Sequence, residues 1–200
     1  EVLFFNQPGG LMDQYTIAQG GLIYIDTQSG NTTRLTPQLG QLVVAESGIS
    51  KQTLSVLQNA REYGQSAIQA VKKHYPKFNI QQAQVADYER YMDAVPGLYQ
   101  NHWYAAIHNY DLTLKAKKAL SAPSVDRVQL GKWMNEHQQI LEERIQNTPE
   151  AMKLQMEAAR KAGALGTKII GSGGGGCMVA MVTEDTKQKV IDAFLSQGAV

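Results

Sequence analysis

Apolar residues are grouped in short runs near both ends of the chain and fall at helical spacing between them. In the first quarter, these runs are bounded by Gly, Pro and Asn, which is typical of strands separated by turns. The pattern predicts strands at residues 2–5, 22–26, 32–35 and 41–46, with the second and third paired across a turn, and a short helix at 11–19.

The middle of the chain has apolar positions three and four residues apart, which predicts helices at residues 50–75, 85–94, 103–120 and 126–145. Pro76 ends the first of them. One face of the last helix carries Leu130, Trp133, Met134, His137, Leu141 and Ile145. Because His137 lies on this apolar face, we expect a core histidine whose polar atoms are satisfied.

The last quarter of the chain predicts a helix, two strands and a second helix. Thr148-Pro149-Glu150 is a typical helix start with Thr148 as its N-cap, and this helix ends near Gly163. Strands are expected at 168–170 and 177–182, and Thr183 caps the final helix. Early strands, central helices, and a hairpin followed by a helix indicate an α+β fold.

Composition removes several classes of function. The 200 residues carry 19 basic and 18 acidic side chains, a net charge of +1 that favours neither nucleic acid nor a membrane surface as a partner. No apolar run approaches the roughly 20 residues that span a bilayer. Cys177 is the one cysteine, which excludes an internal disulfide framework and a cysteine-rich metal site. We therefore expect a cytoplasmic protein.

A run of glycines separates the two strands predicted near the end of the chain. The sequence Gly171-Ser172-Gly173-Gly174-Gly175-Gly176 contains G-x-G-x-x-G, but a strand follows it, whereas a dinucleotide-binding loop opens a helix. The Gly-Lys-Ser/Thr of a Walker A loop is also missing. Two interpretations remain: a flexible hairpin tip, or an anchored loop whose backbone can approach a phosphate.

A second candidate site lies near the start, in the segment Asn6-Gln-Pro-Gly-Gly-Leu-Met-Asp-Gln-Tyr15. There Asp13 follows a Pro-Gly-Gly loop and precedes a short apolar segment. From spacing alone, the favoured interpretation is that Asp13 caps the following helix. The alternative is a carboxylate that accepts a proton from, or holds, a substrate hydroxyl.

Taken together, these motifs resemble the second half of a GHMP kinase. Pro8-Gly-Gly-Leu-Met-Asp-Gln-Tyr15 and Gly166-Thr-Lys-Ile-Ile-Gly-Ser-Gly-Gly-Gly-Gly-Cys177 carry the resemblance. Val43-Val-Ala-Glu-Ser-Gly-Ile-Ser-Lys51 and Leu130-Gly-Lys-Trp-Met-Asn-Glu-His137 are similar to further segments of that superfamily, in the same order. The motif Gly-x-Met-Asp-Gln at Gly10 to Gln14 points to its sugar-kinase branch, near galactokinase and heptose kinases.

The resemblance implies transfer of a phosphoryl group from ATP, with Mg²⁺, to a hydroxyl of a small molecule such as a sugar. It assigns Asp13 as the catalytic base, Gly9, Gly10 and Gln14 as further substrate contacts, and Gly171 to Gly176 as support for the ATP phosphates. It also implies a ferredoxin-like α/β sandwich at residues 39–200, preceded at 1–38 by the last strands of an S5-like ATP-binding domain.

The chain departs from this superfamily in one respect. The main phosphate loop, a Pro-x-Gly-x-Gly-Ser-Ser-Ala run, is absent, and the resemblance places it upstream of Glu1 together with the magnesium ligands and the basic partner of Asp13. We therefore expect a piece of a longer protein that phosphorylates nothing alone. The alternative is a non-catalytic module, derived from the kinase C-terminal domain, that binds a metabolite or mediates association.

Overall fold

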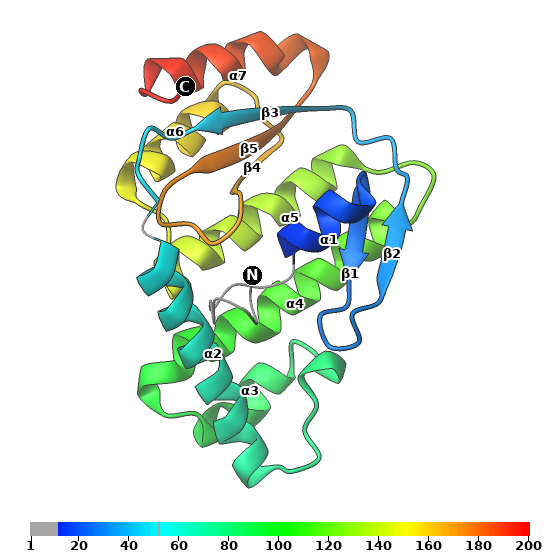
Figure 1. Ribbon diagram of the computed structural model, residues 1–200, viewed down its shortest axis with the longest axis vertical. Helices are drawn as coiled ribbons and strands as arrows, with labels where there is room; N and C mark the ends of the chain where they lie inside the picture. The colour runs from blue at the N-terminus through cyan, green and yellow to red at the C-terminus, as the bar shows by residue number, and fades with distance from the viewer. Residues whose placement is uncertain (1–11, 52) are drawn as a thin grey trace.

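The computed structural model describes residues 12–51 and 53–200 and shows a mixed arrangement of helices and two separate sheets (Figure 1). The predicted strand at 2–5, and Gly9 and Gly10, lie outside the described residues. The pattern predicts the α+β class, in which strands and helices are segregated along the chain. The order of the elements confirms this class.

The first sheet is a two-stranded hairpin beside a short helix. Helix α1 spans Met12–Gln19, and strands β1 (Leu22–Ile25) and β2 (Thr32–Leu35) pair antiparallel, with Leu22 opposite Leu35. Asp26 shapes the turn between them, because its carboxylate accepts hydrogen bonds from the amides of Gln28 and Ser29 at 3.0 and 3.4 Å. The predicted hairpin is therefore confirmed.

The second sheet has three antiparallel strands in the order β3-β5-β4. Its strands are β3 (Gln41–Glu46), β4 (Gly166–Ile169) and β5 (Cys177–Val182), so the first and last parts of the described chain meet in one sheet. Helices α6 (Glu150–Lys161) and α7 (Glu184–Ser196) cover one face (Figure 1). Val43 and Met178 of the strands and Phe194 of α7 belong to the core between the sheet and these helices.

A helical region lies between β3 and β4 in the chain. Helix α2 (Thr53–His74) leads to the short turns η1 (Ile80–Gln82), α3 (Asp87–Tyr91), η2 (Met92–Ala94) and η3 (Gly97–Tyr99), and then to α4 (Gln100–Leu120). Trp103 is fully buried in this region, and its indole N–H donates to the carbonyl of Tyr88 at 3.1 Å. Its burial shows that Trp103 is a packing residue of the helical region.

The predicted helix at 126–145 is divided in the structure. Helix α5 spans Arg127–Ile140, with the Asp126 carboxylate as its N-cap, and a π-helical turn, η4, follows at Leu141–Ile145. Gln146 ends the turn in the left-handed conformation at φ +58°. The wider π turn and this left-handed residue redirect the chain, which a continuous 3.6-residue period does not predict.

Helix α5 packs against β4 at two glycines. A Cβ on Gly166 would lie 2.6 Å from the Cα of Gly131, and a Cβ on Gly131 would overlap the carbonyl of Leu165. The side chain of Asn135 completes the contact, because its oxygen accepts from the amide of Thr167 at 2.9 Å. Backbone-to-backbone packing of this kind requires glycine on both elements.

Two expected caps have different outcomes. Thr183 forms a capping box with Thr186 at the start of α7, as predicted. Thr148 does not cap α6, whose N-cap position is Pro149. Instead, the buried Thr148 hydroxyl accepts a hydrogen bond from the Gln138 side chain at 3.1 Å. The prediction for Thr148 is wrong because a tertiary partner on α5 takes its hydroxyl.

Candidate functional site

The glycine run forms the connection between β4 and β5. Gly171, Gly173, Gly174, Gly175 and Gly176 all have positive φ angles, between 72° and 126°. Side chains of L-residues are strained in this region, so the backbone path itself requires glycine at these five positions. The amide of Ile170 donates to the carbonyl of Cys177 at 2.9 Å and closes the base of the loop.

Two other segments hold the inner part of the loop. Asn147 accepts from the amide of Gly174 at 2.7 Å through its backbone oxygen, and its side chain donates to the carbonyl of Ser172 at 2.9 Å. On the other side, the amide of Gly176 donates to the carbonyl of Ile49 at 3.2 Å. The loop is therefore anchored, which argues against a flexible hairpin tip.

The outer end of the loop has a different character. Gly171 is exposed and Ser172 is half-buried, and within the described ranges neither amide has a hydrogen-bond partner. The Lys51 amine lies beside Gly171, 3.3 Å from the position that a Cβ would occupy on this glycine. An ammonium next to unused amide donors is an arrangement that can bind a phosphate oxygen.

The residues near the start are placed only in part. Asp13 is exposed in the first turn of α1 and lies inside the helix, so the interpretation of Asp13 as the residue that caps this helix is wrong. Gln14 follows it and is half-buried.

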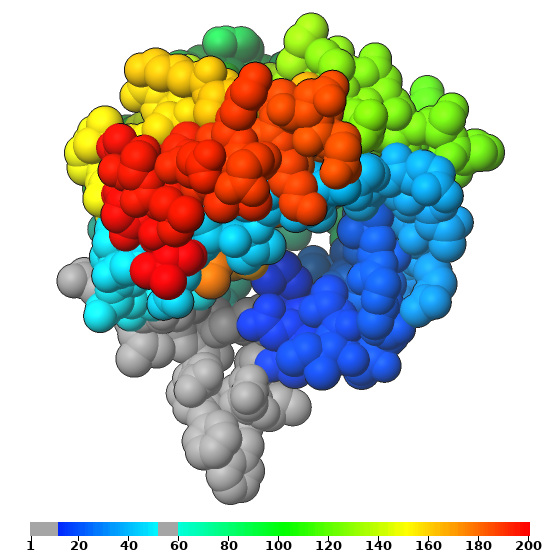
Figure 2. All heavy atoms as spheres, turned by 90° about the horizontal axis from the view of Figure 1, so that it is seen from above, coloured from blue at the N-terminus to red at the C-terminus, as the bar shows by residue number. Residues whose placement is uncertain are grey.

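No hydrogen bond or ion pair within residues 12–51 and 53–200 joins Asp13 to Lys51 or to the glycine run. Seen from above, α7 and β3 form one mass, and α1 with the β1–β2 hairpin forms another, with a hollow between the two masses (Figure 2). The predicted boundary near residue 38 falls between the two sheets, and it stays a prediction.

Possible metal ligands do not form a cluster in the part of the chain that the structure describes. This part contains no group of three or more His, Cys, Asp or Glu side chains able to hold a metal ion. Among the same residues, no helix is both long enough and apolar enough to cross a membrane.

Comparison with known proteins matches residues 116–200 to the family model described as GHMP kinases C terminal. The matched range contains α5, α6, α7, the sheet strands β4 and β5, and the glycine loop. The chain carries a GHMP kinase C-terminal domain. The expected family is thereby confirmed from the part of the sequence that contains its most specific motif.

Individual relatives of this GHMP kinase domain agree. The mevalonate kinase of Thermococcus onnurineus is 49% identical over 71 residues, 36% of this chain and 21% of that protein. The galactokinase of Staphylococcus saprophyticus is 25% identical and covers 94% of this chain and 50% of that protein. The structure of Lactococcus lactis galactokinase complexed with galactose has a TM-score of 0.81 at 20% identity, again covering 94% and 50%. The chain thus spans at most half the length of these relatives.

Two residues of the candidate site, Lys51 and Asn147, are not predicted as site residues from the sequence. A lysine three residues after Gly48, at the start of a helix, could have signalled a cation near a phosphate. No sequence pattern marks Asn147, because its role depends on the π turn that brings it to the loop.

Proposed function

We propose that this chain forms the C-terminal half of the catalytic unit of an ATP-dependent small-molecule kinase, which transfers the γ-phosphoryl group to a hydroxyl of a sugar. The observation that carries this role is the Lys51 amine, which lies beside Gly171 at the end of the loop where the amides of Gly171 and Ser172 are unused. Phosphoryl transfer depends mainly on positioning and on stabilising charge at the phosphate oxygens. A cation and amide donors on an anchored loop supply both.

Asp13 has the complementary role on the acceptor side. Its carboxylate accepts the proton of the substrate hydroxyl as the hydroxyl oxygen attacks the γ-phosphorus. The bond between the γ-phosphorus and the bridging oxygen breaks, and ADP leaves with that electron pair. Lys51 and the amides of Gly171 and Ser172 offset the negative charge of the phosphates during this step.

Two relatives support a sugar as the acceptor. The galactokinase of Staphylococcus saprophyticus covers 94% of the chain, and the galactose complex of the Lactococcus lactis enzyme has the same fold over the same share. The mevalonate kinase match is higher in identity but covers 36% of the chain. Sugar phosphorylation therefore accounts for more of the chain than mevalonate phosphorylation does.

A screen of acceptors tests this function. The longer protein that carries this chain is incubated with ATP, magnesium and either galactose, fucose, a heptose phosphate or mevalonate, and ADP release is measured. We expect turnover with one of the sugars and none with the 200-residue chain alone. Turnover with mevalonate only would replace the sugar, whereas turnover with no acceptor would favour the non-catalytic module.

Substitution of Asp13 tests the mechanism separately. Asp13→Asn should lower kcat by about 10²–10⁴-fold, because an amide cannot accept the hydroxyl proton. Asp192→Asn, at an exposed position on α7, is the matched control and should leave kcat unchanged. Full activity in Asp13→Asn, with an unchanged unfolding midpoint, would remove Asp13 from the reaction.

A further inference from the structure

A small cavity lies between α4, α5 and β4, away from the glycine loop. Its volume is about 210 Å³, and most of its lining is apolar, from Leu112, Ala116, Leu130, Trp133 and Met134. Pockets for drug-sized ligands usually exceed about 300 Å³, so this cavity suits a smaller molecule. No residue of the glycine loop lines it, which separates it from the proposed phosphate site.

One cation faces this apolar cavity. Lys168 extends from β4 on the sheet face opposite α6 and α7, in the same row as Val44 and Val179. It is largely buried, and no acidic side chain within residues 12–51 and 53–200 forms an ion pair with it. Burial lowers its pKa to about 8, so Lys168 is still mostly protonated at neutral pH. An ammonium in such surroundings is costly unless an anion joins it.

His137 supplies a second polar group from α5. It lines the same cavity, and its Nδ1 is buried without a hydrogen-bond partner in the described part of the chain. The expectation of a satisfied core histidine is therefore wrong. Burial first, and then the charge of Lys168, lower the pKa of His137 to about 3. The ring is neutral at physiological pH and can donate one hydrogen bond.

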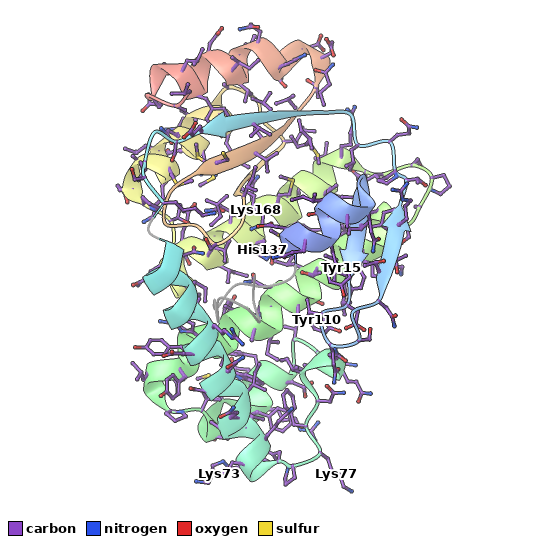
Figure 3. All side chains as sticks on the ribbon, in the orientation of Figure 1. Tyr15, Lys73, Lys77, Tyr110, His137 and Lys168 are labelled. Carbon is purple, nitrogen blue, oxygen red and sulfur yellow. The ribbon has the colours of Figure 1, made fainter. Side chains whose placement is uncertain are left out.

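Figure 3 shows how these groups are placed. Lys168 and His137 lie together in the middle of the molecule, whereas Lys73 and Lys77 project from its far end. The third polar lining residue, Thr113, already donates its hydroxyl to the carbonyl of Asn109 at 2.7 Å. The polar end of the cavity thus offers one positive charge and one neutral imidazole against an otherwise apolar wall.

We propose that this cavity binds a small monocarboxylate with a short apolar chain. The carboxylate pairs with Lys168 and accepts a hydrogen bond from His137, while the apolar chain packs against Trp133 and Leu130. A single cation matches a single negative charge, and a phosphate dianion would have no apolar surface to place against the wall. A neutral molecule of the same shape would leave the Lys168 ammonium unpaired.

The cavity contains its own reporter, because Trp133 lines it while Trp103, the other tryptophan, is buried elsewhere. The purified chain is titrated with sodium isovalerate, and Trp fluorescence and heat are measured. We expect saturable binding with a Kd below about 20 mM. The Kd for the neutral isovaleramide should be higher by about tenfold or more. Trp133→Phe should remove the fluorescence change and retain the heat.

Two variants test the charge. Lys168→Met should lower the affinity for isovalerate about tenfold or more, while Lys77→Met, which removes an exposed lysine, should leave it unchanged. Absence of saturable binding, equal affinity for acid and amide, or unchanged affinity in Lys168→Met would each overturn the proposal.

A pH titration of the unmodified chain gives the same answer if Lys168→Met does not fold. Among the residues that the structure describes, Lys168 and His137 are the titratable groups that line the cavity. Isovalerate affinity should fall by up to about tenfold per pH unit as the pH rises above about 8, the pKa of Lys168 in the ligand-free chain, because the carboxylate pairs with the protonated amine. Affinity that is constant up to pH 11 would equally overturn the proposal. Neither result depends on kinase activity.

Discussion

The backbone oxygen of Asn147 accepts a hydrogen bond of 2.7 Å from the amide of Gly174, and the Asn147 side chain donates one of 2.9 Å to the carbonyl of Ser172. One buried residue thus fixes two points of the glycine loop from outside the sheet. Asn147→Ala should lower the free energy of unfolding by about 1–2 kcal/mol, since it leaves a loop carbonyl without its donor. Urea denaturation measures this change.

The control for Asn147 is Asn31→Ala, at an exposed position in the β1–β2 turn, where the change should stay within about 0.5 kcal/mol. Hydrogen exchange at the Gly174 amide should also accelerate in Asn147→Ala, because the loop loses its side-chain anchor. Equal stability of the two variants would show that the loop keeps its shape without the side-chain bond.

Replacing glycine by alanine should have opposite effects on stability at two positions of the chain. Gly173 has φ +79°, and a Cβ there would overlap the Asn147 backbone oxygen, whereas a Cβ on Gly64, within α2, meets nothing within 4 Å. Gly173→Ala should therefore destabilise the chain by about 2–4 kcal/mol, and Gly64→Ala should stabilise it by about 0.5–1 kcal/mol. Thermal denaturation of both variants checks the difference in sign.

Gln146 lies in the left-handed region at φ +58°, directly before Asn147. Gln146→Gly should raise the free energy of unfolding by about 0.5–1 kcal/mol, because glycine adopts this conformation without strain. The same substitution at Gln139, within α5, should lower it by about 1 kcal/mol. A loss of stability in Gln146→Gly would mean that its side chain matters more than its backbone angle.

Lys51 should contribute to ATP binding if the proposed function is correct. In the longer protein, Lys51→Met should raise the KM for ATP about 10-fold to 100-fold, because it removes the cation beside Gly171. Lys73→Met, which removes an exposed lysine of α2, should leave the KM unchanged. An equal KM in both variants would place the ATP phosphates away from this end of the loop.

The depressed pKa of His137 predicts acid sensitivity. Because its pKa is about 3 in the folded chain and about 6.5 when unfolded, the unfolded state binds more protons between these values. Stability should therefore fall as the pH falls from about 6.5 toward 3. His137→Gln should flatten this part of the curve, whereas His74→Gln, at an exposed position, should not. Urea midpoints between pH 4 and 7 give the comparison.

The sequence predicted the elements whose pattern is local. Strand β3 has the predicted bounds, Gln41–Glu46, because Ser47-Gly48 ends an apolar run, and Thr183 caps α7 through neighbours three residues away. The misassigned residues depend on distant partners. Thr148 is taken by Gln138 of α5, and the polar edge of His137 faces a cavity that three separate elements enclose.

The same distinction between local patterns and distant partners applies to the candidate site. The glycine loop could be found from its composition, because its positive φ angles demand glycine. Lys51 and Asn147 could not, because Lys51 is 120 residues from Gly171 and Asn147 is 25 residues from Ser172 in the sequence. Sequence patterns reveal where the backbone must be unusual, but not which side chains the tertiary fold delivers to it.

The glycine-to-glycine contact between α5 and β4 has a mechanical consequence. With no side chain between Gly131 and Gly166, helix and strand have no compressible layer between them and must move as one body. One end of this body carries His137 and Lys168, and β4 continues directly into Ile170 and the glycine loop. A molecule that shifts α5 at the cavity would therefore displace the glycine loop as well, because the packed backbones of α5 and β4 connect the two sites.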